Sequence, residues 1–275
     1  MKKIPLKKGD RIGIAAAASP FHEEAFLKGV EFLKKEGYEV YFRDDIFDKK
    51  DYLAGSDERR CQELIELLEN PKIKAILFAR GGYGSMRLLP YLDSYFKKRP
   101  KVQPKIIIGY SDLTSLLLYF IQNKKMNPYY GPVVAKDLGE STDKLTQSYL
   151  RKALGDTKPL GELKFKEVES LQSGKALGEI TGGCLSLVVA SLGTPYEINT
   201  KGKILFLEDI HEKPYAVDRM LTQLTLAKKL KTVKGVIFGS LIYDGPESAM
   251  KEAILHGLQG FKGPVLYGFP AGHGK

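Results

Sequence analysis

The first half of the chain alternates short apolar runs with amphipathic segments of helical period. Apolar runs at residues 11–17, 38–42, 74–79 and 106–108 predict strands, and segments with apolar residues three or four positions apart predict the helices between them. Strands that alternate with helices of this length form a parallel sheet that is covered by helices on both faces. We therefore expect an N-terminal α/β domain over residues 1–140.

The pattern weakens after this domain and then returns. Residues 141–177 are polar and contain several glycines, which is typical of a linker. Apolar runs resume at 203–209, 233–238 and 265–269, with helical segments before and between them. We expect a smaller C-terminal domain, α/β or β-rich, over residues 178–275.

Charge and apolar patterning limit the class of protein. Lys and Arg outnumber Asp and Glu by 43 to 33, but the lysines are scattered in short pairs, which favours a soluble surface over nucleic-acid binding. No apolar run is long enough for a transmembrane helix, and the N-terminus lacks the apolar core of a signal peptide. Cys61 and Cys184 lie in no Cys-x-x-Cys spacing, so we expect buried free thiols and a reducing, cytoplasmic location.

Residues 106–116 join a β-branched run to a helical segment through Gly109-Tyr110-Ser111-Asp112. A serine at a sharp turn from strand to helix is a way in which hydrolases expose a nucleophile. The start of the following helix offers N–H groups to a developing oxyanion. The second glycine of G-x-S-x-G is missing, and the same pattern is typical of a turn in which Ser or Asp caps a helix. Both interpretations remain open on these residues alone.

A glycine-rich loop follows the run at 74–79. Its residues Gly81-Gly82-Tyr83-Gly84 could bring backbone N–H groups close to an anion such as a phosphate. The loop matches neither the P-loop nor G-x-G-x-x-G, so a tight turn or a set of donors for an oxyanion fits it better.

Among the four histidines, His273 has the most unusual setting. It lies in Gly272-His273-Gly274, just after an apolar run, where small neighbours leave the imidazole accessible. Glu208 and Asp209 end another apolar run, at the edge where α/β sheets place ligands, although an ion pair with Lys or Arg is the alternative role for Glu208. A serine, a histidine and an acid supply the roles of nucleophile, base and orienting group. No cluster has the spacing of metal ligands, so no metal is expected.

Six ordered blocks carry a resemblance to a known family. The chain resembles the LD-carboxypeptidase family of serine peptidases, which includes murein tetrapeptide LD-carboxypeptidases and microcin C immunity peptidases. The match is collinear from about residue 12 to residue 275. Its blocks are residues 80–84, 109–112, 182–186, 192–195, 207–219 and 272–274.

The resemblance implies a two-domain fold with the active site in the cleft between the domains. It implies that Ser111 is the nucleophile, that His273 is the base and that Glu208 orients the histidine. It also implies an oxyanion hole made by the backbone N–H groups of Gly82 and Asp112. No cofactor is implied.

Two features depart from the family pattern. Tyr130 precedes Gly131-Pro132, where the family often has histidine. The chain also stops at Lys275, two residues after His273, whereas relatives usually continue into a further strand. We therefore expect His273 to be poorly anchored, because terminal residues are often disordered unless they are tied down.

The resemblance implies a cytoplasmic enzyme that releases the terminal D-alanine from murein tetrapeptides during cell-wall recycling. A carboxypeptidase must bind a free carboxylate, and Arg80 with Gly81 is our candidate for this role, with a structural ion pair as the alternative for Arg80. The same catalytic residues could instead cleave peptidyl-nucleotides. A non-catalytic small-molecule-binding module is the alternative from a different class. We expect a homodimer that binds neither nucleic acid nor membrane.

Overall fold

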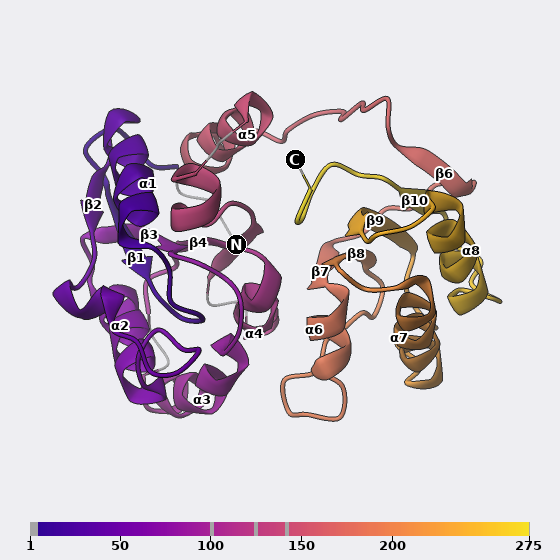
Figure 1. The fold of residues 1–275 in the computed structure, drawn as a ribbon, viewed down its shortest axis with the longest axis horizontal. Helices are drawn as coiled ribbons and strands as arrows, with labels where there is room; N and C mark the ends of the chain where they lie inside the picture. Colours follow the sequence, from indigo (N-terminus) through magenta and orange to yellow (C-terminus); the bar gives the residue numbers. More distant parts are fainter. Residues whose placement is uncertain (1–4, 100–101, 124–125, 141–142, 275) are drawn as a thin grey trace. The chain divides into compact units, whose positions relative to one another are not determined.

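The computed structural model describes residues 5–99, 102–123, 126–140 and 143–274. The chain divides into two compact units, the first ending at Gly161 and the second beginning at Glu162. Both units are α/β (Figure 1), as predicted. No helix in the described ranges is long and apolar enough to cross a membrane.

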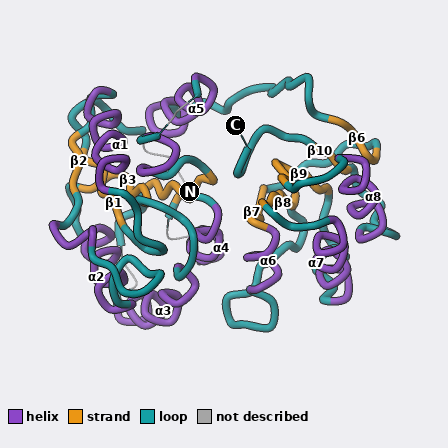
Figure 2. Tube along the Cα trace, in the orientation of Figure 1, coloured by secondary structure: helices purple, strands orange, loops and turns teal. Residues whose placement is uncertain are grey.

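The first unit contains a five-stranded parallel sheet in the order β2-β1-β3-β4-β5. Figure 2 shows its strands between helices. The elements in chain order are β1 (Arg11–Ala15), α1 (Glu23–Lys35), β2 (Glu39–Tyr41), α2 (Asp57–Glu69), β3 (Ile73–Phe78), α3 (Leu89–Lys98), β4 (Ile106–Gly109), α4 (Thr114–Asn123), β5 (Asn127–Tyr130) and α5 (Lys144–Gly155).

Alternate residues of the strands pack against different helices. Ile12, Leu77 and Ile108 belong to a core that also includes buried residues of α1 and α5. Gly13 points the other way, where a Cβ would lie 2.7 Å from Leu67 of α2. Because successive side chains of a strand point to opposite faces, helices on both sides bury both faces of the sheet. This explains the nearly continuous apolar runs of its strands.

The strand order reverses direction between β1 and β3. In open α/β sheets, ligands bind beyond the carboxyl ends of the strands at such a switch point. The loops after β1 and β3 meet there, and the turn after β4 begins on the neighbouring strand. This edge carries the glycine loop and Ser111.

The second unit has a mixed sheet in the order β6-β10-β9-β8-β7, in which only the β6–β10 pair is antiparallel. Helices α6, α7 and α8 pack in one layer against it (Figure 1). The elements are β6 (Glu169–Gln172), β7 (Ile180–Cys184), α6 (Leu185–Ala190), β8 (Ile204–Ile210), α7 (Pro214–Leu226), β9 (Gly235–Ile242), α8 (Glu247–Gly257) and β10 (Val265–Tyr267).

Two boundaries differ from the sequence-based expectation. The segment 141–177, expected as a linker, contains α5 and β6, so it contributes an element to each unit. Strand β8 continues to Ile210, one residue beyond the expected run at 203–209, so Glu208 lies inside the strand. The pairing of β8 with β9 shifts register between Leu207 and Asp209, so Glu208 lies at an irregularity of the ladder.

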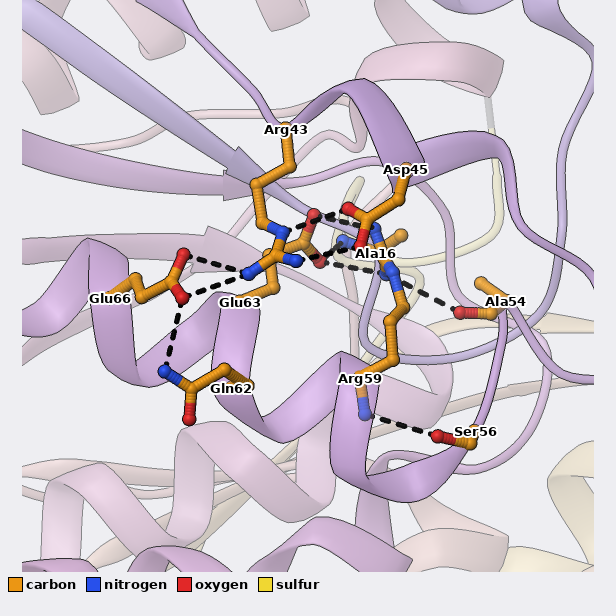
Figure 3. A network of polar contacts seen from close by, with 9 residues as sticks. All are labelled: Ala16, Arg43, Asp45, Ala54, Ser56, Arg59, Gln62, Glu63 and Glu66. Carbon is orange, nitrogen blue, oxygen red and sulfur yellow. Dashed lines mark hydrogen bonds and ion pairs between the residues drawn. The ribbon is translucent and has the colours of Figure 1, made fainter.

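A polar network ties α2 to the end of β1 (Figure 3). The fully buried Glu63 accepts a hydrogen bond from the N–H of Ala16 at 2.7 Å and two from Arg59 at 3.0 and 3.2 Å. Burial raises the pKa of Glu63 to about 7 from its ordinary 4.5, although Arg59 pulls that pKa down. Between pH 4.5 and about pH 7, the folded protein therefore keeps a proton on Glu63 that the unfolded chain loses. The contribution of Glu63 to stability falls as the pH rises through this range.

We expect Glu63→Ala to lower the free energy of unfolding by about 3–5 kcal/mol at pH 8, because it leaves Arg59 and the Ala16 N–H buried without their carboxylate. Glu66 offers a matched control on the same helix, since it is 40% exposed and pairs with Arg43 at 2.8 Å. Glu66→Ala should cost no more than about 1 kcal/mol. Urea unfolding of both variants measures the difference, and equal losses would contradict this account.

Candidate active site

The turn between β4 and α4 contains a strained serine. Ser111 has a φ of +64°, a left-handed conformation that is uncommon outside glycine. Such a conformation costs on the order of 1–3 kcal/mol and persists only where the surroundings hold it. The N–H of Ser111 donates to the Tyr130 hydroxyl at 3.2 Å, and the N–H of Leu113 donates to the Tyr110 carbonyl at 3.3 Å. This strand–turn–helix geometry is that of a nucleophile elbow.

The glycine loop approaches this serine closely. A Cβ on Gly81 would lie 3.1 Å from Ser111 Cβ and 3.4 Å from its Oγ, so the loop backbone passes beside the hydroxyl. No residue in the described ranges accepts a hydrogen bond from the N–H of Gly82 or of Asp112. The N–H groups of Gly82 and Asp112 can therefore donate to a new partner.

The side chain of Asp112 holds the loop to the elbow. Its buried carboxylate accepts from the N–H of Ser85 at 2.8 Å, and the Ser85 hydroxyl donates to the Asp112 carbonyl at 2.6 Å. Burial raises the pKa of Asp112, and the hydrogen bonds from Ser85 oppose that shift. These contacts make the Asp112 side chain structural.

Arg80 lies at the start of the same loop and is exposed. Its Nη1 donates to the carbonyl of Pro20 at 2.6 Å, so a backbone oxygen holds it in place of the ion pair considered from the sequence. Nearby, Tyr83 of the loop and Tyr52 meet edge to face at 5.4 Å, with 51% and 60% of their surfaces exposed.

In the second unit, Glu208 and His273 form a close pair. Glu208 is fully buried, and its Oε2 lies 2.7 Å from His273 Nδ1. The same oxygen accepts from the backbone N–H of His273 at 2.9 Å. The expectation of a poorly anchored histidine is thus wrong, because one carboxylate holds both its ring and its backbone.

The residue before the histidine must be small for this pair to form. Gly272 has a φ of +108°, and a Cβ there would lie 2.2 Å from Glu208 Oε2. The adjoining loop also bonds to β9, because the N–H of Ser240 donates to the Ala271 carbonyl at 3.0 Å.

Asp209 has a different role from its neighbour. It accepts a hydrogen bond from the N–H of Ser186 at 2.8 Å and so satisfies an N–H in the first turn of α6. Cys61 and Cys184 are buried and form no disulfide, as predicted, and burial raises the pKa of the Cys61 thiol to about 11. Within the described part of the chain, no group of three or more His, Cys, Asp or Glu could hold a metal.

Sequence comparison decides the family. The LD-carboxypeptidase N-terminal domain matches residues 12–131, and the LD-carboxypeptidase C-terminal domain matches residues 177–275. The chain belongs to the LD-carboxypeptidase family. It is therefore a relative of serine carboxypeptidases, and the resemblance found in its motifs is confirmed.

Three relatives show how the family extends. A probable murein peptide carboxypeptidase of Bacillus subtilis is 36% identical, over 99% of this chain and 86% of its own length. A muramoyltetrapeptide carboxypeptidase structure from Oxalobacter formigenes has a TM-score of 0.78 at 25% identity, over 96% and 89% of the two chains. The microcin C7 self-immunity protein MccF, solved with aspartyl sulfamoyl adenosine, has a TM-score of 0.82 at 29% identity, over 99% and 91%.

The structure groups the candidate residues of this LD-carboxypeptidase relative into two sets. The first unit contains Gly81 beside Ser111, with Arg80 and Gly82 on either side of Gly81 in the same loop and Asp112 next to Ser111 in the chain. The second unit joins Glu208 to His273. Sequence reasoning missed three residues that hold the glycine loop. Ser19 accepts from the N–H of Tyr83, Arg60 donates to the Gly84 carbonyl, and the N–H of Ser85 donates to Asp112. In sequence, a serine before proline and an arginine in a charged helix look solvent-exposed.

We expect Gly272→Ala to separate Glu208 from His273, because a Cβ cannot fit 2.2 Å from the carboxylate oxygen. The proton on His273 Nδ1 should then lose its downfield NMR resonance. Gly260→Ala is the matched control, since Gly260 also has a positive φ but a Cβ there meets nothing within 4 Å. A resonance that survives Gly272→Ala unchanged would show that the close contact does not matter.

Proposed function

We propose that this protein is a serine LD-carboxypeptidase that releases the terminal D-alanine from murein tetrapeptides in the cytoplasm during cell-wall recycling. The observation that carries the proposal is the buried Glu208–His273 pair. In serine hydrolases, a histidine is the general base, and a carboxylate that binds its Nδ1 orients it. The left-handed Ser111 supplies the nucleophile elbow that such a base needs.

The mechanism follows from the atoms that these residues present. Ser111 Oγ attacks the carbonyl carbon of the scissile amide and gives its proton to His273 Nε2, because Glu208 holds Nδ1. The N–H groups of Gly82 and Asp112 bind the oxyanion. The imidazolium then protonates the amine of D-alanine, which leaves. A water activated by the same histidine hydrolyses the acyl-enzyme and regenerates Ser111.

Substrate binding needs a cation for the carboxylate of the terminal residue. Arg80 is the candidate, because it is exposed, starts the glycine loop and is steadied by the Pro20 carbonyl. A guanidinium can bind a carboxylate through two parallel hydrogen bonds.

A second substrate class is supported by a relative. MccF has been solved with aspartyl sulfamoyl adenosine, so peptidyl-nucleotides are the alternative substrates for the same catalytic residues. We expect D-alanine release from a murein tetrapeptide to exceed cleavage of an aminoacyl sulfamoyl adenosine. Comparison of kcat/KM on the two substrates measures this preference, and the reverse order would assign the chain to the immunity-type activity.

Ser111→Ala should lower D-alanine release by at least about 10³-fold, because loss of the nucleophile removes the covalent step. A fluorophosphonate should form an adduct at Ser111 in the wild type, located by mass spectrometry. Ser115→Ala is the control, since the buried Ser115 hydroxyl has no hydrogen-bond partner among the residues that the structure describes and should be dispensable. Wild-type release in Ser111→Ala would contradict Ser111 as the nucleophile. A wild-type protein that is never labelled and releases no D-alanine would favour a non-catalytic binding module.

A further inference from the structure

One buried cation has no part in the mechanism described so far. Arg60, in the first turn of α2, has none of its surface exposed. Its Nη1 donates to the carbonyl of Ala17 and, at 3.0 Å, to the carbonyl of Gly84, while Nη2 pairs with Asp57. A single side chain therefore joins the loop after β1 to the loop after β3.

Ser19 holds the glycine loop on both sides of Gly82, and Arg60 holds it at Gly84. On one side, the N–H of Ser19 donates to the Gly81 carbonyl at 3.2 Å, and its Oγ accepts from the N–H of Tyr83 at 3.1 Å. On the other side, Gly84 has a φ of +119°, and a Cβ there would lie 2.8 Å from Arg60 Nη1. Gly82 lies between these anchors.

We propose that Arg60 is a positioning residue whose hydrogen bonds to the Ala17 and Gly84 carbonyls, together with the Ser19 contacts on both sides of Gly82, fix the direction of the Gly82 N–H. The inference deepens the proposed function and rests on it. Oxyanion donors act only when they are aimed at the position where charge develops, and loss of one donor typically lowers kcat by about 10²–10³-fold. Glycines leave a loop many conformations, so its orientation must come from its surroundings.

The placement of Arg60 suits this role better than a general contribution to stability. Its contacts go to two backbone carbonyls of the loops and to one carboxylate. Arg59, the neighbouring residue on the same helix, has 9% of its side chain exposed. It binds the carboxylates of Glu63 and Asp45 and, at 3.4 Å, the Ala54 carbonyl. Arg60 therefore mainly holds the two loops, whereas Arg59 mainly pairs with carboxylates.

The test measures the rate at which a fluorophosphonate labels Ser111, together with kcat and KM on a murein tetrapeptide. Arg60→Met should lower the labelling rate and kcat by about 100-fold and change KM by less than about threefold, since the lost interaction belongs to the transition state. Arg60→Lys should recover about tenfold of the loss, because an ammonium can still donate to the carbonyls. Amide exchange in residues 79–88 should be faster in Arg60→Met.

Arg59→Met is the control for lost stability. It should lower the midpoint of unfolding but leave labelling, kcat and loop exchange near wild-type values. The inference is overturned if Arg60→Met labels at the wild-type rate, or if Arg59→Met slows labelling equally. A wild type that is not labelled at Ser111 contradicts the proposed function instead. In that case amide exchange in residues 79–88 tests Arg60. Equal exchange in Arg60→Met and Arg59→Met would show that Arg60 does not hold the loop.

Discussion

A single buried carboxylate organises the C-terminal part of the candidate site. Glu208 has none of its surface exposed, and a buried carboxylate is costly unless hydrogen bonds compensate it. The backbone and ring of His273 supply two of these bonds through the same oxygen. The loop after β10 is therefore held by the polar requirement of a residue in the middle of β8, and Gly272 is the residue that lets the loop come close enough.

Buried charge also sets the conformation of the first unit. Helix α2 presents Arg60 and Glu63 to the ends of β1 and β3, where backbone groups leave the sheet. These side chains satisfy a carbonyl or an N–H that the strand ladder no longer pairs. The strained Ser111 belongs to the same edge, so rigid surroundings hold an unfavourable φ beside a glycine loop of fixed shape.

The fold was largely predictable because its signals are local. Alternation of strand and helix periods predicted the parallel sheet of the first unit, and the ordered motifs predicted a two-domain α/β family fold. Strand β8 was expected at 203–209 and spans 204–210, but the burial of its charged residues Glu208 and Asp209 was not expected. Burial of a charged residue depends on partners far along the chain, which no local pattern contains.

The candidate site shows the same limit. Ser111 and His273 were recognisable from their glycine neighbours, since small residues mark sharp turns and close approaches. The pairing of Glu208 with His273, which are 65 residues apart, was expected only from the family resemblance. The contact of Arg60 with Gly84, over 24 residues, was not expected at all. Arg60 has the sequence context of a solvated helix face, and only its complete burial reveals a different role.

The division of the chemistry between two compact units bears on how activity arises during synthesis. The unit with the candidate nucleophile ends at Gly161, and the candidate base lies in the second unit, at position 273. Domains generally fold as units and the N-terminal one folds first as the chain is made. On the proposed assignment, a nascent chain carries a shaped but inert serine until the second unit has been made. Hydrolysis then begins only when both units have folded, so earlier products of synthesis stay harmless to peptides around them.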